Sequence, residues 1–257
     1  MSQDKFIIYA DKNAKILKQL IDFFHKNNFA VEILEISQKI NQKWLKSAHN
    51  GSLLIDNDEL FLIADGMKVN PNWQSLTNRI VKAGKKTENL LKIAKLQNDM
   101  QVIDCTAGFG HDSLILASTG ASVAMIEQNP LMFLLLQCEY QKQLNNPNWQ
   151  KLLGRILLNF GKSVDILPTL PKADVIYLDP MFPQDSYKSA VGKTMQILHF
   201  IENPPSFDDE MDLLNSAKNG LKTNGRVIVK RPKSAPFLAN LTPIDSLTND
   251  VVRFDVY

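Results

Sequence analysis

Cysteine is scarce in this chain of 257 residues, which contains only Cys105 and Cys138. Their spacing matches neither a zinc site nor the even set of cysteines that builds a disulfide framework. The start of the chain lacks a charged lead-in followed by an apolar core, and the longest apolar run, around LMFLLL, is too short to span a bilayer. These absences predict a soluble protein of the reducing cytoplasm.

The chain also has little net charge and few histidines. The formal charge is +2, so no basic field around the whole molecule indicates nucleic acid, although a local basic face is compatible with this value. The histidines, His25, His49, His111 and His199, show no metal-ligand spacing, and we expect no metal. No serine or cysteine lies in a nucleophile-elbow pattern, so hydrolase chemistry has no support. With 44% hydrophobic and 22% charged residues, the composition is that of an ordinary globular protein.

The pattern of apolar residues changes along the chain and predicts two domains. Residues 1–97 are expected to form a small α+β lobe, with strands at KFIIYAD and AVEILEI, a helix over residues 13–27, two short strands around Asp56-Asn57-Asp58, and a helical pattern over residues 75–96. In residues 98–257, the apolar strands MQVIDC, ASVAMIE, RILLNFG, ADVIYLD and GRVIVKR alternate with helical stretches over residues 111–119, 130–144 and 208–219. This alternation predicts an α/β fold with a mostly parallel sheet covered on both faces, and DVVRFDVY as a late antiparallel strand.

The segment VIDCTAGFGHDS places small residues between a buried strand and a helix. Ala107, Gly108 and Gly110 allow the backbone to approach a ligand closely, next to the free N–H groups of a helix N-terminus. The next strand ends at Glu127, where a carboxylate commonly accepts hydrogen bonds from both hydroxyls of a ribose. These features predict a nucleoside cofactor, and both NAD and S-adenosylmethionine fit. Ser113 stands in the position of the third glycine of the dinucleotide pattern, which favours S-adenosylmethionine because it has no pyrophosphate.

The segment IYLDPMFP delivers an acidic residue at the end of an apolar strand. Because ligands of open α/β sheets bind at the carboxyl ends of the strands, we expect Asp179 to face the same crevice as the glycine loop. Asp179 and the carbonyl of Pro180 can accept hydrogen bonds from an exocyclic amine and stabilise the charge that develops as this amine attacks a methyl group. Phe182 can stack on the base.

This loop resembles the [N/D]-P-P-[Y/F] loop of amino-group methyltransferases, and Asp-Pro-Met-Phe-Pro is similar to that of the ribosomal RNA small subunit methyltransferase J family. The segments VIDCTAGFGHDSLILASTGASVAMIEQNP, KSAVGKTMQIL, VIVKRPKSAPFLAN and RFDVY resemble the same family, in order, over most of residues 101–257. The resemblance implies a class I, Rossmann-like fold with a mostly parallel seven-stranded sheet. It also implies methylation of the N2 amine of a guanosine in 16S rRNA with S-adenosylmethionine as cofactor.

The resemblance further implies a set of cofactor contacts in this chain. They fall on His111, Asp112, Glu127, Gln128, Lys162, Ser163 and Asp179. His111 and Gln128 stand where the family commonly has arginine, and Lys162 stands where a small hydroxyl residue is usual. Residues 1–90 resemble the family only loosely, and its basic, glycine-rich segment is reduced here to KAGKKTE.

Several basic residues follow strand ends on the presumed crevice side. Such residues can bind phosphates and position an RNA without reading its sequence. The predicted contacts with 16S rRNA or the small ribosomal subunit are Lys188, Lys193, Lys230, Arg231 and Lys233.

Two other functions are compatible with the sequence. A methyltransferase acting on adenine N6 would use the same loop, and only a test with substrate separates the two. A non-catalytic RNA- or ribosome-binding module with a degenerate crevice is the second, against which the intact Asp179, Pro180 and Phe182 argue.

Overall fold

The computed structural model describes residues 5–84, 86–182, 201 and 203–257, and its chain divides into two compact units between Pro71 and Asn72. This division lies earlier in the sequence than the predicted boundary at residue 97. The physical reason is that Trp73, Leu91 and Ile93 are buried in the core of the second unit, although they precede its first strand. The predicted helical pattern over residues 75–96 therefore belongs to the larger unit.

The N-terminal unit contains a five-stranded sheet with the strand order β2-β1-β3-β4-β5. Its elements are β1 (Phe6–Ala10), α1 (Leu17–Lys26), β2 (Val31–Glu35), α2 (Gln42–Ser47), β3 (Ser52–Asp56), β4 (Glu59–Ala64) and β5 (Met67–Val69). Asn57 and Asp58, between β3 and β4, have φ angles of 52° and 60°. Two consecutive positive φ angles are typical of the hairpin turn whose twist matches that of the strands, and the predicted pair of strands is confirmed.

The C-terminal unit contains a seven-stranded sheet with the strand order β11-β12-β10-β9-β6-β7-β8. Its strands are β6 (Gln101–Asp104), β7 (Ser122–Glu127), β8 (Ile156–Phe160), β9 (Ala173–Leu178), β10 (Leu221–Pro232), β11 (Asp245–Thr248) and β12 (Val252–Val256). The pairs among β6, β7, β8, β9 and β10 are parallel, whereas β12 is antiparallel to β10 and β11. The mostly parallel, seven-stranded α/β fold and its late antiparallel strand are confirmed.

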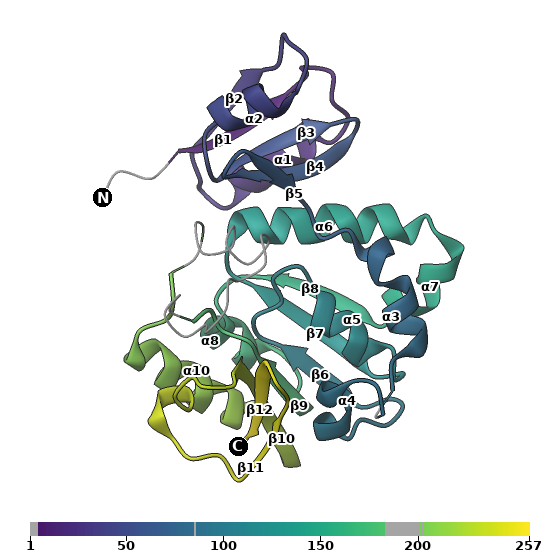
Figure 1. Cartoon of the computed structure of the whole chain (residues 1–257), viewed down its shortest axis with the longest axis vertical. Coiled ribbons are helices and arrows are strands. Elements are labelled where there is room, and N and C mark those ends of the chain that lie inside the picture. Colours follow the sequence, from purple (N-terminus) through teal and green to yellow (C-terminus); the bar gives the residue numbers. More distant parts are fainter. Residues whose placement is uncertain (1–4, 85, 183–200, 202) are drawn as a thin grey trace. The chain divides into compact units, whose positions relative to one another are not determined.

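Helices cover both faces of this sheet (Figure 1). Those described are η1 (Trp73–Leu76), α3 (Thr77–Lys82), α4 (Asn89–Ala94), α5 (His111–Ala117), α6 (Pro130–Leu144), α7 (Pro147–Leu153), α8 (Ser163–Ile166), η2 (Leu167–Thr169), α10 (Phe207–Asn219) and η4 (Leu238–Asn240). On one face, residues of α4, α5 and α7 form a core with Val102, Val175 and Ile228 of the sheet. On the other face, Leu214 of α10 packs with Val227. None of the helices in the described residues is both long and apolar enough to cross a membrane.

Local sequence signals set where two of these helices begin. The side chain of Asn129 accepts hydrogen bonds from the backbone N–H groups at the start of α6, and Pro130 follows at the first helical position, where no backbone donor is needed. Ser206 and Asp209 form a reciprocal capping box at the start of α10. Helix α6 has the predicted bounds, residues 130–144.

Candidate active site

Strand alternation brings a row of polar side chains to the carboxyl edge of the large sheet. Side chains two residues apart in a strand point to the same face. The buried residues Val102, Met125, Val175 and Ile228 share the face covered by α4 and α5. Two residues further along each strand, the side chains on this same face are Asp104, Glu127, Tyr177 and Lys230, and Asp179 follows Tyr177 by two more residues. These residues form the site described below.

The glycine loop between β6 and α5 uses its two glycines differently. Both have positive φ angles, 53° at Gly108 and 74° at Gly110. A Cβ atom at Gly110 would lie 2.9 Å from Leu136 and 3.1 Å from Trp73, so this glycine is required by packing. A Cβ at Gly108 would meet nothing closer than the Thr106 carbonyl at 3.9 Å, so space beside it is open to a ligand.

Glu127, at the end of β7, is buried and tied to the glycine loop. Its Oε2 atom accepts a hydrogen bond from the N–H of Gly108 at 2.8 Å, and its Oε1 atom accepts one from the N–H of Asn129 at 2.7 Å. These two bonds fix the Glu127 carboxylate beside the glycine loop, at the carboxyl end of β7. The contact of Glu127 with a ribose stays a prediction.

The aspartate-proline loop is joined to the same edge by its backbone and by an ion pair. The N–H of Asp179 donates to Oγ1 of Thr106 at 2.6 Å, which links the end of β9 to the glycine loop. Nζ of Lys230 lies 2.8 Å from Oδ2 of Asp179 and 2.8 Å from Oδ2 of Asp112. The hydroxyl of Tyr177 donates to the same Asp112 atom at 2.7 Å. The predicted residues Asp112 and Asp179 are therefore brought together by one lysine.

The charges of this cluster are strongly interdependent. Burial alone would raise the pKa of Asp112, but the Lys230 ammonium, the Tyr177 hydroxyl and Arg79 outweigh it and lower the pKa to about 2. For Asp179, burial and the neighbouring Asp112 charge outweigh Lys230 and raise the pKa. Burial would lower the pKa of Lys230, but both carboxylates raise it, so the ammonium form is stabilised. The site is thus a cation between two carboxylates of unequal acidity.

Asp104 is a buried carboxyl group that the sequence analysis did not single out as a site residue. It accepts hydrogen bonds from the Ser113 hydroxyl at 2.5 Å and from the Thr106 N–H at 3.0 Å. These bonds connect the end of β6 to the glycine loop and to helix α5. Burial raises its pKa to about 7, against the lowering effect of these donors. Its position at the end of β6, one strand over from Tyr177, is the signal that could have identified it.

The raised pKa of Asp104 predicts a pH-dependent stability. The folded state binds the proton more tightly than the unfolded state, so the free energy of unfolding falls as the pH rises from about 4 to about 7, by about 4 kcal/mol for this group. We expect Asp104→Asn to remove this contribution, measured by urea unfolding at a series of pH values. Asp179, whose pKa is also raised, contributes to the slope that remains. Parallel curves for the variant and the wild type would contradict this assignment.

Phe182 and Arg231 are both buried, whereas the sequence predicted a ring that stacks on a base and a basic side chain that binds RNA. The Phe182 ring is 3% exposed, and the guanidinium carbon of Arg231 lies 4.5 Å from the ring centroid. Arg231 is 4% exposed and donates to Oε1 of Glu210 on α10 at 3.1 Å and 3.2 Å. Strand alternation explains this, because Arg231 follows Lys230 and points to the opposite face of the sheet. In this arrangement Arg231 covers one face of the buried Phe182 ring, which anchors the loop and is not exposed for stacking on a base.

The other predicted cofactor residues differ in burial and in their position in the fold. Ala107 is buried, and His111 and Asp112 open helix α5. Ser163 is buried and its hydroxyl donates to the Cys105 carbonyl at 2.5 Å, so it ties α8 to the end of β6. Gln128 and Lys162 are exposed and lie one residue after β7 and at the N-cap of α8, respectively.

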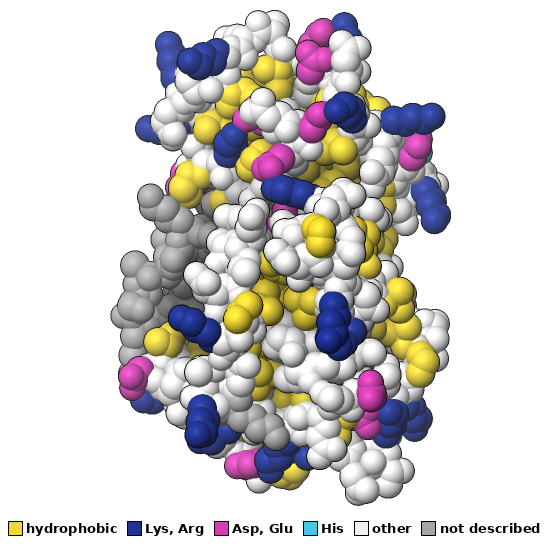
Figure 2. Space-filling model, turned by 90° about the vertical axis from the view of Figure 1, so that its right-hand side faces the viewer, with side chains coloured by type: hydrophobic (Ala, Val, Ile, Leu, Met, Phe, Trp, Pro, Cys, Tyr) yellow, Lys and Arg dark blue, Asp and Glu magenta, His cyan; other side chains and the backbone are white. Residues whose placement is uncertain are grey.

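The predicted RNA contacts are distributed unevenly. Lys188 and Lys193 lie outside the described residues. Lys233 is exposed, whereas Lys230 and Arg231 are paired with carboxylates, which corrects the expectation that they offer free charges at the surface. On the face shown in Figure 2, lysine and arginine side chains are dispersed among uncharged and acidic ones.

Trp73 is a second buried residue that the sequence did not indicate as part of the site. Its Nε1–H donates to the Phe109 carbonyl in the glycine loop at 2.7 Å, and its backbone N–H donates to Oε1 of Glu139 on α6 at 2.9 Å. The indole is fully buried and stacks on Trp149 with the ring centroids 6.2 Å apart. Nothing in the local sequence around Trp73 points to this contact, because its partners lie 36 and 66 residues away.

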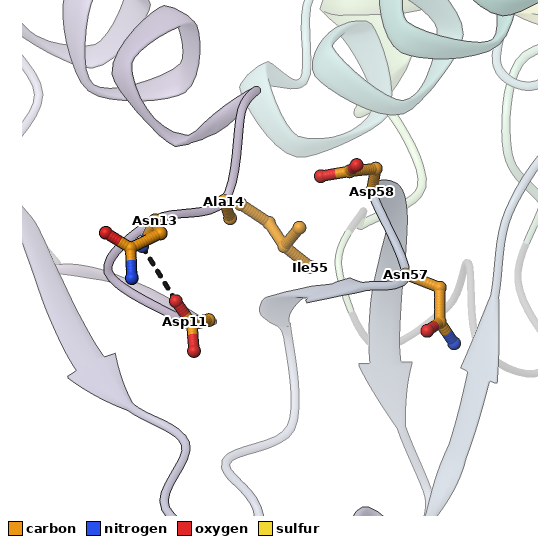
Figure 3. A pocket seen from close by; sticks show the side chains of 6 residues that line it. All are labelled: Asp11, Asn13, Ala14, Ile55, Asn57 and Asp58. Carbon is orange, nitrogen blue, oxygen red and sulfur yellow. Dashed lines mark hydrogen bonds between the residues drawn. The ribbon is translucent and has the colours of Figure 1, made fainter.

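A pocket of about 270 Å³ lies in the N-terminal unit, and it contains none of the predicted site residues (Figure 3). It is formed by the loop after β1 and the turn between β3 and β4, and its lining residues are Asp11, Asn13, Ala14, Ile55, Asn57 and Asp58. The N–H of Asn13 donates to Oδ1 of Asp11 at 2.8 Å, so part of its polar lining is used within the loop. In the described ranges, no group of three or more His, Cys, Asp or Glu side chains is arranged to hold a metal ion.

Comparison with known proteins shows which family the chain is similar to. A family model described as "Putative SAM-dependent methyltransferase" matches residues 23–257. The chain is 44% identical to ribosomal RNA small subunit methyltransferase J of Psychrobacter arcticus, over 91% of this chain and 87% of that protein. It is 37% identical to the protein of the same name from Acinetobacter baumannii, over 91% of this chain and 86% of that protein. The crystal structure of a SAM-dependent methyltransferase from Neisseria gonorrhoeae has 29% identity and a TM-score of 0.72, covering 98% of this chain and 94% of that one.

Proposed function

Because the chain belongs to the ribosomal RNA small subunit methyltransferase J family, we propose that it transfers a methyl group from S-adenosylmethionine to the N2 amine of a guanosine in 16S rRNA. The observation that carries this proposal is the junction of two loops at one sheet edge. The Asp179 backbone is bonded to Thr106 of the glycine loop, and the Asp179 carboxylate shares Lys230 with Asp112 of helix α5. A cofactor held by the glycine loop would therefore lie next to an amine held by the aspartate-proline loop.

The residues at this edge fit S-adenosylmethionine. The space beside Gly108 admits a ligand, and the Glu127 carboxylate, fixed next to it by the N–H groups of Gly108 and Asn129, is the group we assign to the ribose hydroxyls. The N-terminus of α5, with His111 and Asp112, lies at the end of the same loop. When bound, the cofactor supplies a methyl group activated by a sulfonium centre.

Asp179 is the residue we assign to the amine. An aryl amine is a weak nucleophile because its lone pair is delocalised into the ring. A carboxylate that accepts an N–H hydrogen bond stabilises the positive charge that develops on the nitrogen during attack. The nitrogen–carbon bond forms as the carbon–sulfur bond breaks, and the amine loses one proton by way of the Asp179 carboxylate. Pro180 would add its carbonyl as a second acceptor, and its buried ring stiffens the loop.

The partner is proposed to be 16S rRNA or the small ribosomal subunit, in the cytoplasm. Lys233 is the exposed residue among the described basic candidates, and Lys188 and Lys193 are carried forward as further RNA contacts. Guanine N2 is an amine on the edge of a base that is stacked between its neighbours, and we propose that the base is unstacked to bring this amine to the carboxyl edge of the sheet.

The proposed function is tested with tritium-labelled S-adenosylmethionine, unmodified 16S rRNA transcribed in vitro, and small subunits. We expect label in the RNA, and N2-methylguanosine as the product nucleoside identified by mass. Label in N6-methyladenosine would replace the guanosine assignment with the adenine alternative. Cofactor binding without transfer to either substrate would refute the rRNA assignment, and absence of cofactor binding would favour a non-catalytic RNA-binding module.

A further inference from the structure

Lys230 has surroundings that a contact with an RNA phosphate does not explain. Its Nζ atom lies 2.8 Å from an oxygen of each of two carboxylates, and the side chains of Lys230, Asp112 and Asp179 are only 24%, 18% and 25% exposed. An ammonium group in this position is already neutralised, so it offers little charge to a phosphate. Sheet register puts it there: Val229 of β10 pairs with Leu178 of β9, so Lys230, still within β10, lies level with Asp179, the first residue after β9.

Without a cation, this arrangement of carboxylates would not hold two negative charges. Asp112 and Asp179 direct their Oδ2 atoms to the same point, and two carboxylates at such a site tend to share one proton.

Other titratable groups also face this pair. Asp104 adds a third acidic group on β6, and the Tyr177 hydroxyl on β9 donates to Asp112. Arg79 on α3 lies 3.9 Å from Asp112. Arg79 is also bonded to Glu88 at 2.8 Å, so its charge is divided. Lys230 is the cation in direct contact with both Asp112 and Asp179 among the described residues.

We propose that Lys230 is a positioning residue, which bridges Asp112 and Asp179 and keeps both carboxylates ionised, so that Asp179 accepts a hydrogen bond from the substrate amine. Its Oδ2 atom is held by Lys230, and in the described part of the chain no donor is bonded to its Oδ1 atom, which is left for the amine. A protonated Asp179 would offer an O–H donor in place of one acceptor. The inference rests on the proposed function only for the identity of the substrate amine. The ionisation of the two carboxylates does not depend on that function.

The test compares Lys230→Met, Lys230→Arg and the wild type in methyl transfer to 16S rRNA across a pH series. Removal of the ammonium group raises the pKa of Asp179 further, since burial and the Asp112 charge then act unopposed. We expect the acidic limb of the kcat profile of Lys230→Met to move up by about one to three pH units, with activity regained as the pH rises. Lys230→Arg retains the cation and is expected to keep the wild-type profile.

A second measurement does not depend on catalysis. The infrared spectrum of cofactor-free Lys230→Met at neutral pH, minus that of the wild type, is expected to show the C=O stretch of a protonated carboxyl group. Both spectra are recorded in the Asp104→Asn background, because Asp104 has a pKa of about 7 and its protonation depends on the charge of Asp179. Lys222→Met is the matched control, because Lys222 lies on the same strand and binds Asp174 at the same 2.8 Å distance, at the opposite end of β9. It is expected to show neither the band nor the pH shift.

The inference is overturned if Lys230→Met keeps the wild-type pH profile and infrared spectrum while its KM for rRNA rises and depends less steeply on salt concentration. That pattern would mark Lys230 as a phosphate contact. If the wild type transfers no methyl group to rRNA, the proposed function fails, and the infrared difference still decides the role of Lys230. The two failures are therefore distinguishable.

Discussion

Asp179→Asn is expected to reduce kcat for methyl transfer by about a hundredfold to a thousandfold, the usual effect of losing one group that stabilises developing charge. The substitution keeps the size of the side chain but removes the negative charge from the oxygen that faces the amine. Because the main role of Asp179 is proposed to lie in the transition state, kcat should fall far more than affinity for the cofactor. Single-turnover transfer to 16S rRNA and calorimetric titration with S-adenosylmethionine separate the two effects.

The same variant should be no less stable than the wild type. The pKa of Asp179 is raised in the folded protein, so its ionised form costs stability above the pKa of the unfolded state, and asparagine removes this cost. A thermal midpoint at or above that of the wild type would show that lost activity does not come from misfolding. Asp174→Asn is the control, since Asp174 also binds a lysine on β10 but lies at the amino end of β9. Equal loss of activity in both variants would contradict the role of Asp179.

Trp73→Ala is expected to lower the free energy of unfolding by about 4 kcal/mol, because it empties a fully buried site in the larger core. Trp73→Phe is the more informative change. It keeps most of the ring packing but leaves the Phe109 carbonyl of the glycine loop without its donor, at a cost of about 1–3 kcal/mol. Urea unfolding measures both values.

The loss of this hydrogen bond should also be seen in cofactor binding. The Phe109 carbonyl lies between Gly108 and Gly110, so a loosened loop is expected to weaken S-adenosylmethionine binding about tenfold, or about 1.4 kcal/mol. Trp149→Phe is the control: it removes a buried indole from the same stack but no bond to the glycine loop. If both tryptophan variants lower affinity equally, the effect comes from the core and not from the loop.

The sequence by itself determined most of the longer elements and their order, but the short elements α2, β5, α7 and β11 were not predicted. Apolar residues recur every two residues in a strand and every three to four in a helix, and this spacing can be recognised in the sequence alone. Helix caps such as Asn129 and Ser206 also depend only on residues close by in the chain. The carboxyl ends of parallel strands meet at one edge by a general rule, so Glu127 and Asp179 could be predicted to share a crevice. The α/β class followed from the same alternation, whereas the strand count of seven came from family resemblance.

Only the tertiary structure decided which partner each charged side chain takes. Lys230 and Arg231 are neighbours in a lysine- and arginine-rich segment, yet strand alternation sends one to Asp112 and Asp179 and the other to Glu210 and Phe182. The carboxylates that neutralise them lie between 21 and 118 residues away, and a sequence pattern holds no information on such distant pairs. Burial of Phe182 and the contact from Trp73 to the glycine loop have the same origin, because packing joins segments that are remote along the chain.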